Sequence, residues 1–168
     1  MWVRDPHRGG KKIPADAQRR TAQRIQRYAG QHHRDRFERL EVRFRGVFCY
    51  VDANVEPDSP SDDLLDVLGE TRDEYVSRLR NTPLRLCRLR FFGDEEAWGM
   101  AYYTYSQEKY EDSFFATGAW FGTPEEAIET SAMFLQRSPL VGGRFVRPDG
   151  SASSTGDPPA LDPDALKG

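Results

Sequence analysis

The chain has 168 residues, of which 30% are charged and 38% hydrophobic, and its formal net charge is −3. This length suits one domain with a single core, and no run approaches the roughly 20 apolar residues that would cross a bilayer. No positively charged start followed by an apolar run suggests a signal peptide, so we expect a cytoplasmic protein without membrane association.

The charges are unevenly distributed along the chain. Residues 1–45 contain thirteen lysines and arginines against five acidic residues, a balance of +8, whereas the remainder has a balance of −11. Such an asymmetry favours either an anionic partner for the basic part or two complementary halves of one domain.

The N-terminal third is predicted to form a loop, a helix and two strands. Residues 1–14 are rich in the residue types that form turns. A thin apolar stripe then predicts a helix from about residue 16 to residue 33. Residues 37–45 and 47–54 alternate between apolar and polar side chains, which predicts two strands joined at Gly46.

The middle of the chain is predicted to be a loop followed by a short helix. Residues 56–70 contain two prolines and several acids, so we expect a flexible acidic loop there. Thr71 and Glu74 form a capping box, which predicts a helix through Arg80 that ends before Pro83.

The clearest pattern lies in residues 84–135. Aromatic residues, together with short polar turns, predict three strands at residues 84–92, 97–106 and 109–117. Thr123 and Glu126 form a second capping box, and the spacing of the apolar residues after it predicts a helix that lies across the sheet.

The predicted order is helix, two strands, short helix, three strands, helix. Because sequential strands are usually adjacent, we expect an α+β fold with a mostly antiparallel sheet of about five strands and helices packed on one face. Residues 1–137 would form this single domain. Residues 138–168 are rich in Gly, Pro, Ser and Asp, which predicts a disordered C-terminal tail.

Alternation along the strands divides their side chains between two faces of the sheet. The two cysteines, Cys49 and Cys87, fall on the apolar face and lack the spacing of a zinc site, so we expect reduced core thiols. The opposite face would present arginines beside aromatic rings, namely Arg43, Arg45, Phe48, Tyr50, Arg88 and Arg90.

This second face has two interpretations. Guanidinium groups bind phosphate and stack on bases, so RNA or single-stranded DNA is one expected partner, with Arg20, Arg24 and Arg27 of the first helix as a further basic surface. The alternative is a solvated face whose arginines pair with Glu41, Asp52 or Glu111 and cover the rings. A protein-interaction module that uses the exposed aromatic residues and the acidic loop is the second functional hypothesis. The oligomeric state is not predictable.

The sequence offers little for catalysis, and an enzyme is the less favoured class. No nucleophile, metal-protease or dinucleotide motif is present, and His32 and His33 point to different sides of a helix end, so we expect no cofactor and no metal. Gly9-Gly10 beside Lys11 resembles a phosphate-binding loop without the Walker spacing. With His7 it defines a third hypothesis, an enzyme acting on a phosphorylated small molecule.

Five segments of the chain are distinctive: Met1–His7, Arg43–Tyr50, Leu86–Arg90, Tyr102–Ser106 and Gly122–Ala127. Together, and above all in the opening Trp-Val-Arg-Asp-Pro-His, they resemble an uncharacterised bacterial family of small hypothetical proteins, over most of the chain up to about Leu135. The family has no assigned activity. The resemblance therefore implies a bacterial cytoplasmic origin and carries over no catalytic residue.

Overall fold

The computed structural model of the chain describes residues 5–57 and 59–135. The predicted tail from residue 138 onwards lies outside the described residues.

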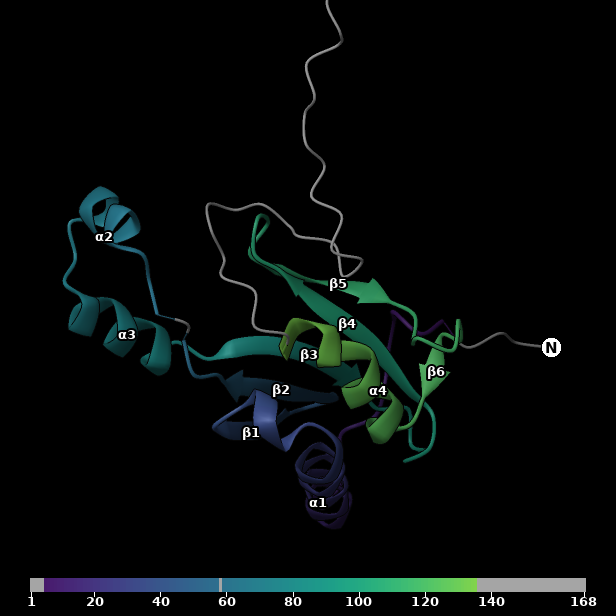
Figure 1. Cartoon of the computed structure of the whole chain (residues 1–168). Coiled ribbons are helices and arrows are strands. Elements are labelled where there is room, and N and C mark those ends of the chain that lie inside the picture. Colours follow the sequence, from purple (N-terminus) through teal and green to yellow (C-terminus); the bar gives the residue numbers. More distant parts are fainter. Residues whose placement is uncertain (1–4, 58, 136–168) are drawn as a thin grey trace, which may run out of the picture.

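An antiparallel sheet forms the centre of the fold (Figure 1). Its strands are β1 (Arg39–Arg45), β2 (Phe48–Asn54), β3 (Leu84–Arg90), β4 (Trp98–Thr104) and β5 (Lys109–Ser113), in the order β1-β2-β3-β4-β5. A sixth strand of two residues, β6 (Phe121–Gly122), pairs with β4 beyond the end of β5. The predicted antiparallel sheet of about five strands is confirmed.

Two helices cover one face of this sheet. Helix α1 (Ala15–His32) packs on β1, and α4 (Pro124–Ser131) packs on β3, on β4 and on α1. Short 3-10 helices follow them, η1 (Arg34–Arg36) and η2 (Ala132–Leu135). The predicted capping box of α4 is present, since Thr123 Oγ1 accepts from the Glu126 N–H at 3.2 Å and a Glu126 carboxylate oxygen accepts from the Thr123 N–H at 2.8 Å.

The core lies between the sheet and these two helices. Helix α1 contributes Ile25 and Ala29, and α4 contributes Ala127 and Ile128. The strands contribute Leu40, Cys49, Val51, Ala53, Cys87, Leu89, Trp98 and Met100. Both cysteines are free and buried, as expected for reduced core thiols. Burial raises the pKa of Cys87 to about 12 and that of Cys49 well above its usual value.

The other two helices, α2 (Asp62–Leu68) and α3 (Arg72–Asn81), form an arm between β2 and β3. Neither helix has a buried residue. Figure 1 shows the arm standing to one side of the sheet, whereas α1 and α4 lie against it. The arm therefore contributes little to the core of the domain.

Helix α2 corrects one prediction, because residues 62–68 lie inside the stretch 56–70 that we expected to be a flexible loop. The Ser61 hydroxyl caps the helix by accepting from the Leu64 N–H at 3.4 Å. Gly69 ends it with a left-handed φ of 67° and donates its N–H to the Leu65 carbonyl at 2.8 Å. The two prolines and the acids favoured a loop in this stretch. The sequence also contains a serine that can cap a helix and a glycine that can end one, and these two residues were sufficient to predict α2.

Candidate functional site

The face of the sheet opposite α1 and α4 carries the arginines and rings that the strand alternation predicted. Arg43, Tyr50 and Arg88 lie opposite one another on β1, β2 and β3, and Arg45, Phe48 and Arg90 form the next row. We call this surface the open face; besides these six residues it carries Glu41, Asp52, Arg85, Tyr103, Tyr110 and Asp112.

Four arginines of the open face, Arg43, Arg85, Arg88 and Arg90, lie over its aromatic rings. The Arg88 guanidinium carbon lies 4.3 Å from the centre of the Phe48 ring and 5.0 Å from that of Tyr110. Arg90 also lies on Phe48, at 4.7 Å, and Arg43 lies 5.4 Å from the Tyr50 ring. These contacts form a continuous arginine–aromatic ladder across neighbouring strands.

Three members of the ladder were not predicted as site residues. Tyr103 and Tyr110 face each other on β4 and β5, with ring centres 5.1 Å apart. Arg85 lies over Tyr103 at 4.2 Å. Alternation along β4 puts Tyr103 on the open face, because Tyr103 is two residues from Ala101, which pairs with Arg88. Tyr110 lies opposite Tyr103 on β5 and therefore shares this face.

Arg85 could not be placed by alternation. A period of two would put it on the same side as Cys87, in the core. However, the pairing of β2 with β3 shifts after Val51, so that Asp52 lies opposite Arg85 rather than opposite Leu86. This β-bulge moves Arg85 to the open face, where bulges commonly redirect a side chain.

The ladder borders an open hollow of about 430 Å³. Its lining consists of Arg43, Phe44, Arg45, Tyr50, Arg85 and Tyr110. Three arginines and two tyrosines therefore line one depression. This composition suits a ligand that has both an anionic group and a planar ring.

Few acids balance these arginines. Among the twelve residues that define the open face, five arginines meet three carboxylates, which gives this set a net charge of +2. Asp52 accepts from Arg43 at 2.7 Å, and Asp112 lies 3.8 Å from Arg88. Within residues 5–57 and 59–135, Arg45, Arg85 and Arg90 form no ion pair. Acids therefore neutralise Arg43 and, at a longer distance, Arg88, but they do not neutralise the whole face.

Burial and pairing act in opposite directions on these two arginines. Arg88 is half-buried among the rings, and this burial lowers its pKa below the usual value. The hydrogen bond from Arg43 to Asp52 raises the pKa of Arg43. Both side chains remain charged near neutral pH because an arginine pKa starts far above 7.

The N-terminal segment borders the open face at one end. A Cβ placed on Gly99 would come within 2.6 Å of the Pro6 carbonyl oxygen, so the segment touches β4 directly. Arg90 donates to the Gly9 carbonyl at 2.8 Å, and His7 lies 3.2 Å from Asp112 of β5. The residues of the suspected phosphate-binding loop thus pack along the sheet.

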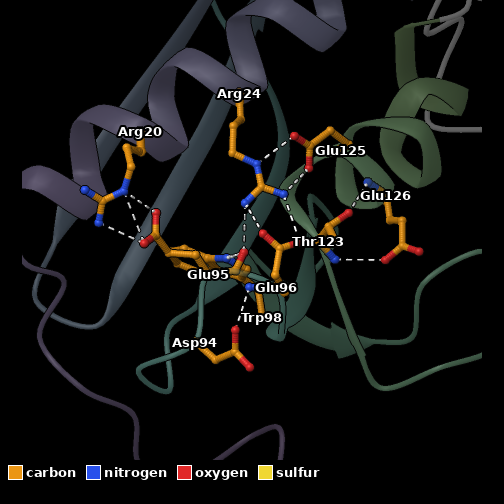
Figure 2. A network of polar contacts seen from close by, with 9 residues as sticks. All are labelled: Arg20, Arg24, Asp94, Glu95, Glu96, Trp98, Thr123, Glu125 and Glu126. Atoms are coloured by element: carbon orange, nitrogen blue, oxygen red, sulfur yellow. Dashed lines mark hydrogen bonds and ion pairs between the residues drawn. The ribbon is translucent and has the colours of Figure 1, made fainter.

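The arginines of α1 occupy a different site, shown in Figure 2. Arg24 donates to both carboxylate oxygens of Glu125 at 2.7 Å and to Glu96 at 2.6 Å. Arg20 donates to Glu95 at 2.9 and 3.0 Å. These bonds join α1 to the β3–β4 turn and to the start of α4. Arg20 and Arg24 are therefore placed as structural cross-links, away from the open face.

Arg27 of the same helix is exposed. In the described part of the chain it has no acidic partner within salt-bridge distance, in contrast to Arg20 and Arg24. The structure thus does not bring the three predicted helix arginines together with those of the strands.

The histidines at the end of α1 also have structural partners. His33 is buried and shares a hydrogen bond of 2.9 Å with Glu129 of α4. The Tyr28 hydroxyl donates to the same carboxylate at 3.0 Å. His33 and Tyr28 together hold the pKa of Glu129 below its usual value. No group of three or more potential metal ligands is found among the described residues.

Comparisons of the chain with protein-family models, curated protein sequences and solved structures find no match. The resemblance to a bacterial family therefore stays a prediction. None of the helices in residues 5–57 and 59–135 combines the length and the hydrophobicity that a bilayer span requires.

Proposed function

We propose that this protein is a cytoplasmic, non-enzymatic domain that binds RNA or single-stranded DNA through the open face. The observation that carries this proposal is the arginine–aromatic ladder, which spans β1 to β5 on the face that α1 and α4 leave uncovered.

The geometry of the ladder suits a phosphate backbone. A guanidinium that stacks on a ring uses its planar face, whereas its five N–H donors point outward in the plane. Arg88 and Arg90 can therefore stay on Phe48 and still donate to phosphate oxygens. Stacking also restricts the side chain before the ligand arrives, which lowers the entropic cost of binding.

The rings add a contribution that does not depend on base sequence. Phe48, Tyr50, Tyr103 and Tyr110 are each partly exposed. Base stacking on such rings contributes about 1–3 kcal/mol per base, and every base offers a planar face. We therefore expect modest sequence preference and strong dependence on salt.

A fluorescence anisotropy titration tests the proposal with labelled single strands of about 12 nucleotides, a length within the range that sheet-based domains cover. We expect binding at about 50 mM salt, where phosphate contacts are strong. Arg90→Gln should weaken it, and Arg27→Gln on α1 serves as the matched control. Absence of binding to both RNA and DNA under these conditions would retire the proposal.

The arm supports a second candidate function, that of a protein-interaction module. Val67 and Leu68 at the end of α2 are 84% and 46% exposed, beside the acidic Asp62, Asp63 and Asp66. A partner chain recovered in stoichiometric amount after nuclease treatment, and lost in the Val67→Ser variant, would favour this function. Nucleic-acid binding by the same variant should remain unchanged, because the arm lies apart from the ladder.

A further inference from the structure

Asp52 is an unusual residue on the open face, because it is an acid that is almost fully buried among arginines. It lies on β2, two residues from Tyr50, and is 4% exposed. Its neighbours across the sheet are Glu41 on β1 and Arg85 on β3. Arg43, Arg85 and Tyr50 line the hollow, whereas Asp52 does not line it but bonds Arg43 and lies opposite Arg85.

Only one oxygen of this carboxylate is bonded. Oδ2 accepts from Arg43 at 2.7 Å. Oδ1 is buried and has no hydrogen-bond partner in the described part of the chain. A buried charged acceptor without a donor is costly, and because native proteins satisfy most such groups, each exception calls for an explanation. Arg85 lies opposite Asp52, but its guanidinium lies over Tyr103 instead.

We propose that the hollow binds one nucleotide unit and that Asp52 Oδ1 accepts a hydrogen bond from it. The phosphate would lie on Arg43, Arg45 and Arg85, with the planar base on a tyrosine. The donor is an O–H or N–H of the sugar or base, such as the ribose 2′-hydroxyl or a base amino group. This inference rests on the proposed binding of single strands and assigns Asp52 as its specificity-determining residue.

Access to the carboxylate depends on Arg43. Its side chain is 51% exposed and bonds Asp52 with only one of its nitrogens. A phosphate that draws Arg43 outward would uncover the carboxylate below it. Arg43 keeps its bond to Oδ2 during this movement, so Oδ1 is the oxygen that the incoming donor reaches.

The variant Asp52→Asn separates this role from simple charge. The amide oxygen would keep the bond to Arg43, which turns the NH2 group toward the ligand's donor, so affinity for oligonucleotides should fall. Affinity for polyphosphate, a polyanion without such donors, should rise because a negative charge is removed. The affinity for oligonucleotides divided by the affinity for polyphosphate should therefore fall about tenfold. This is the effect of losing one hydrogen bond to a charged group.

Glu41→Gln is the matched control, because it removes one exposed carboxylate from the same face, opposite Asp52. It should raise affinity for both polyanions and leave their ratio unchanged. Equal behaviour of Asp52→Asn and Glu41→Gln would overturn the inference while leaving single-strand binding intact. Failure of the wild-type protein to bind any oligonucleotide would instead overturn both proposals.

Titration of the wild-type protein identifies the donor and does not depend on the folding of any variant. Preference for RNA over DNA of the same sequence assigns the 2′-hydroxyl, and preference among DNA homopolymers assigns a base N–H. Equal affinity per phosphate for RNA, all DNA homopolymers and polyphosphate would overturn the assignment of Asp52.

Discussion

Replacing Arg45 by glutamine should reduce the salt dependence of single-strand binding by a calculable amount. Arg45 is exposed, lines the hollow and has no ion pair in residues 5–57 and 59–135, so its removal leaves no acid unpartnered. The same lack of an ion pair in this part of the chain applies to Arg85 and Arg90. If each of these three arginines neutralises one phosphate, and Arg43 and Arg88 release no further counterion because acids already pair with them, binding to single strands should show a slope of about −2.1 in log K against log salt.

This slope predicts a measurable change in affinity. Between 50 and 200 mM salt the wild-type protein should lose about 18-fold in affinity, whereas Arg45→Gln, with a slope of about −1.4, should lose about sevenfold. Thermal unfolding of the two proteins should coincide, because an exposed arginine without partners contributes little to the fold.

Anisotropy titrations at four or more salt concentrations provide the two slopes. Arg27→Gln is the control, since it removes the same charge from the opposite layer of the molecule and should keep the wild-type slope. The reasoning is refuted if Arg45→Gln also keeps the wild-type slope, or if Arg27→Gln reduces it equally. The second result would indicate that binding follows total charge rather than the open face.

Three further predictions concern the fold. Gly99→Ala should lower the free energy of unfolding in urea by about 1–3 kcal/mol, because its Cβ would meet a backbone oxygen of the N-terminal segment at 2.6 Å; unchanged stability would mean that this segment does not rest on β4. Burial alone would raise the pKa of Glu125, but Arg24 outweighs burial and holds it below the usual 4.5. The stability from this pair is thus complete above pH 4.5 and lost as the pH falls through the lowered pKa. Arg24→Gln should differ most from wild type at neutral pH, and urea titrations that gave a constant difference down to pH 3 would contradict this. Cys49 and Cys87 should react with a thiol reagent only after denaturant is added, since both are buried; rapid labelling of the native protein would argue against the core described above.

The strands and the two capping boxes were predictable because they depend on local order in the sequence. Alternation in β1 and β2 identified a buried side and an exposed side before any pairing was known. Thr71 and Thr123 each bond a backbone N–H three residues away, so their helix starts are set by neighbours in the chain. The six residues predicted for the open face were identified by the same local alternation.

The contacts that could not be predicted from the sequence are those between residues far apart in the chain. The partner of Arg24 is Glu125, 101 residues away, and nothing local indicates that the two meet. Arg85 reaches the open face only because of the bulge in the pairing of β2 with β3. A bulge changes which residues share a face, and strand alternation alone does not reveal it.

The charge asymmetry of the sequence allowed two explanations, and the structure assigns them to different arginines. Arg20 and Arg24 of α1 meet the acids of the β3–β4 turn and of α4, so there the basic and acidic parts of the chain complement each other. On the open face Asp52 bonds Arg43, and Asp112 lies beside His7 and Arg88, whereas in the described part of the chain Arg45, Arg85 and Arg90 remain without ion pairs. Arg27 of α1 has no ion pair in the described residues either, but Arg85 and Arg90 also lie over aromatic rings. This combination of unpaired charge and rings directs our proposal to the sheet rather than to the helix.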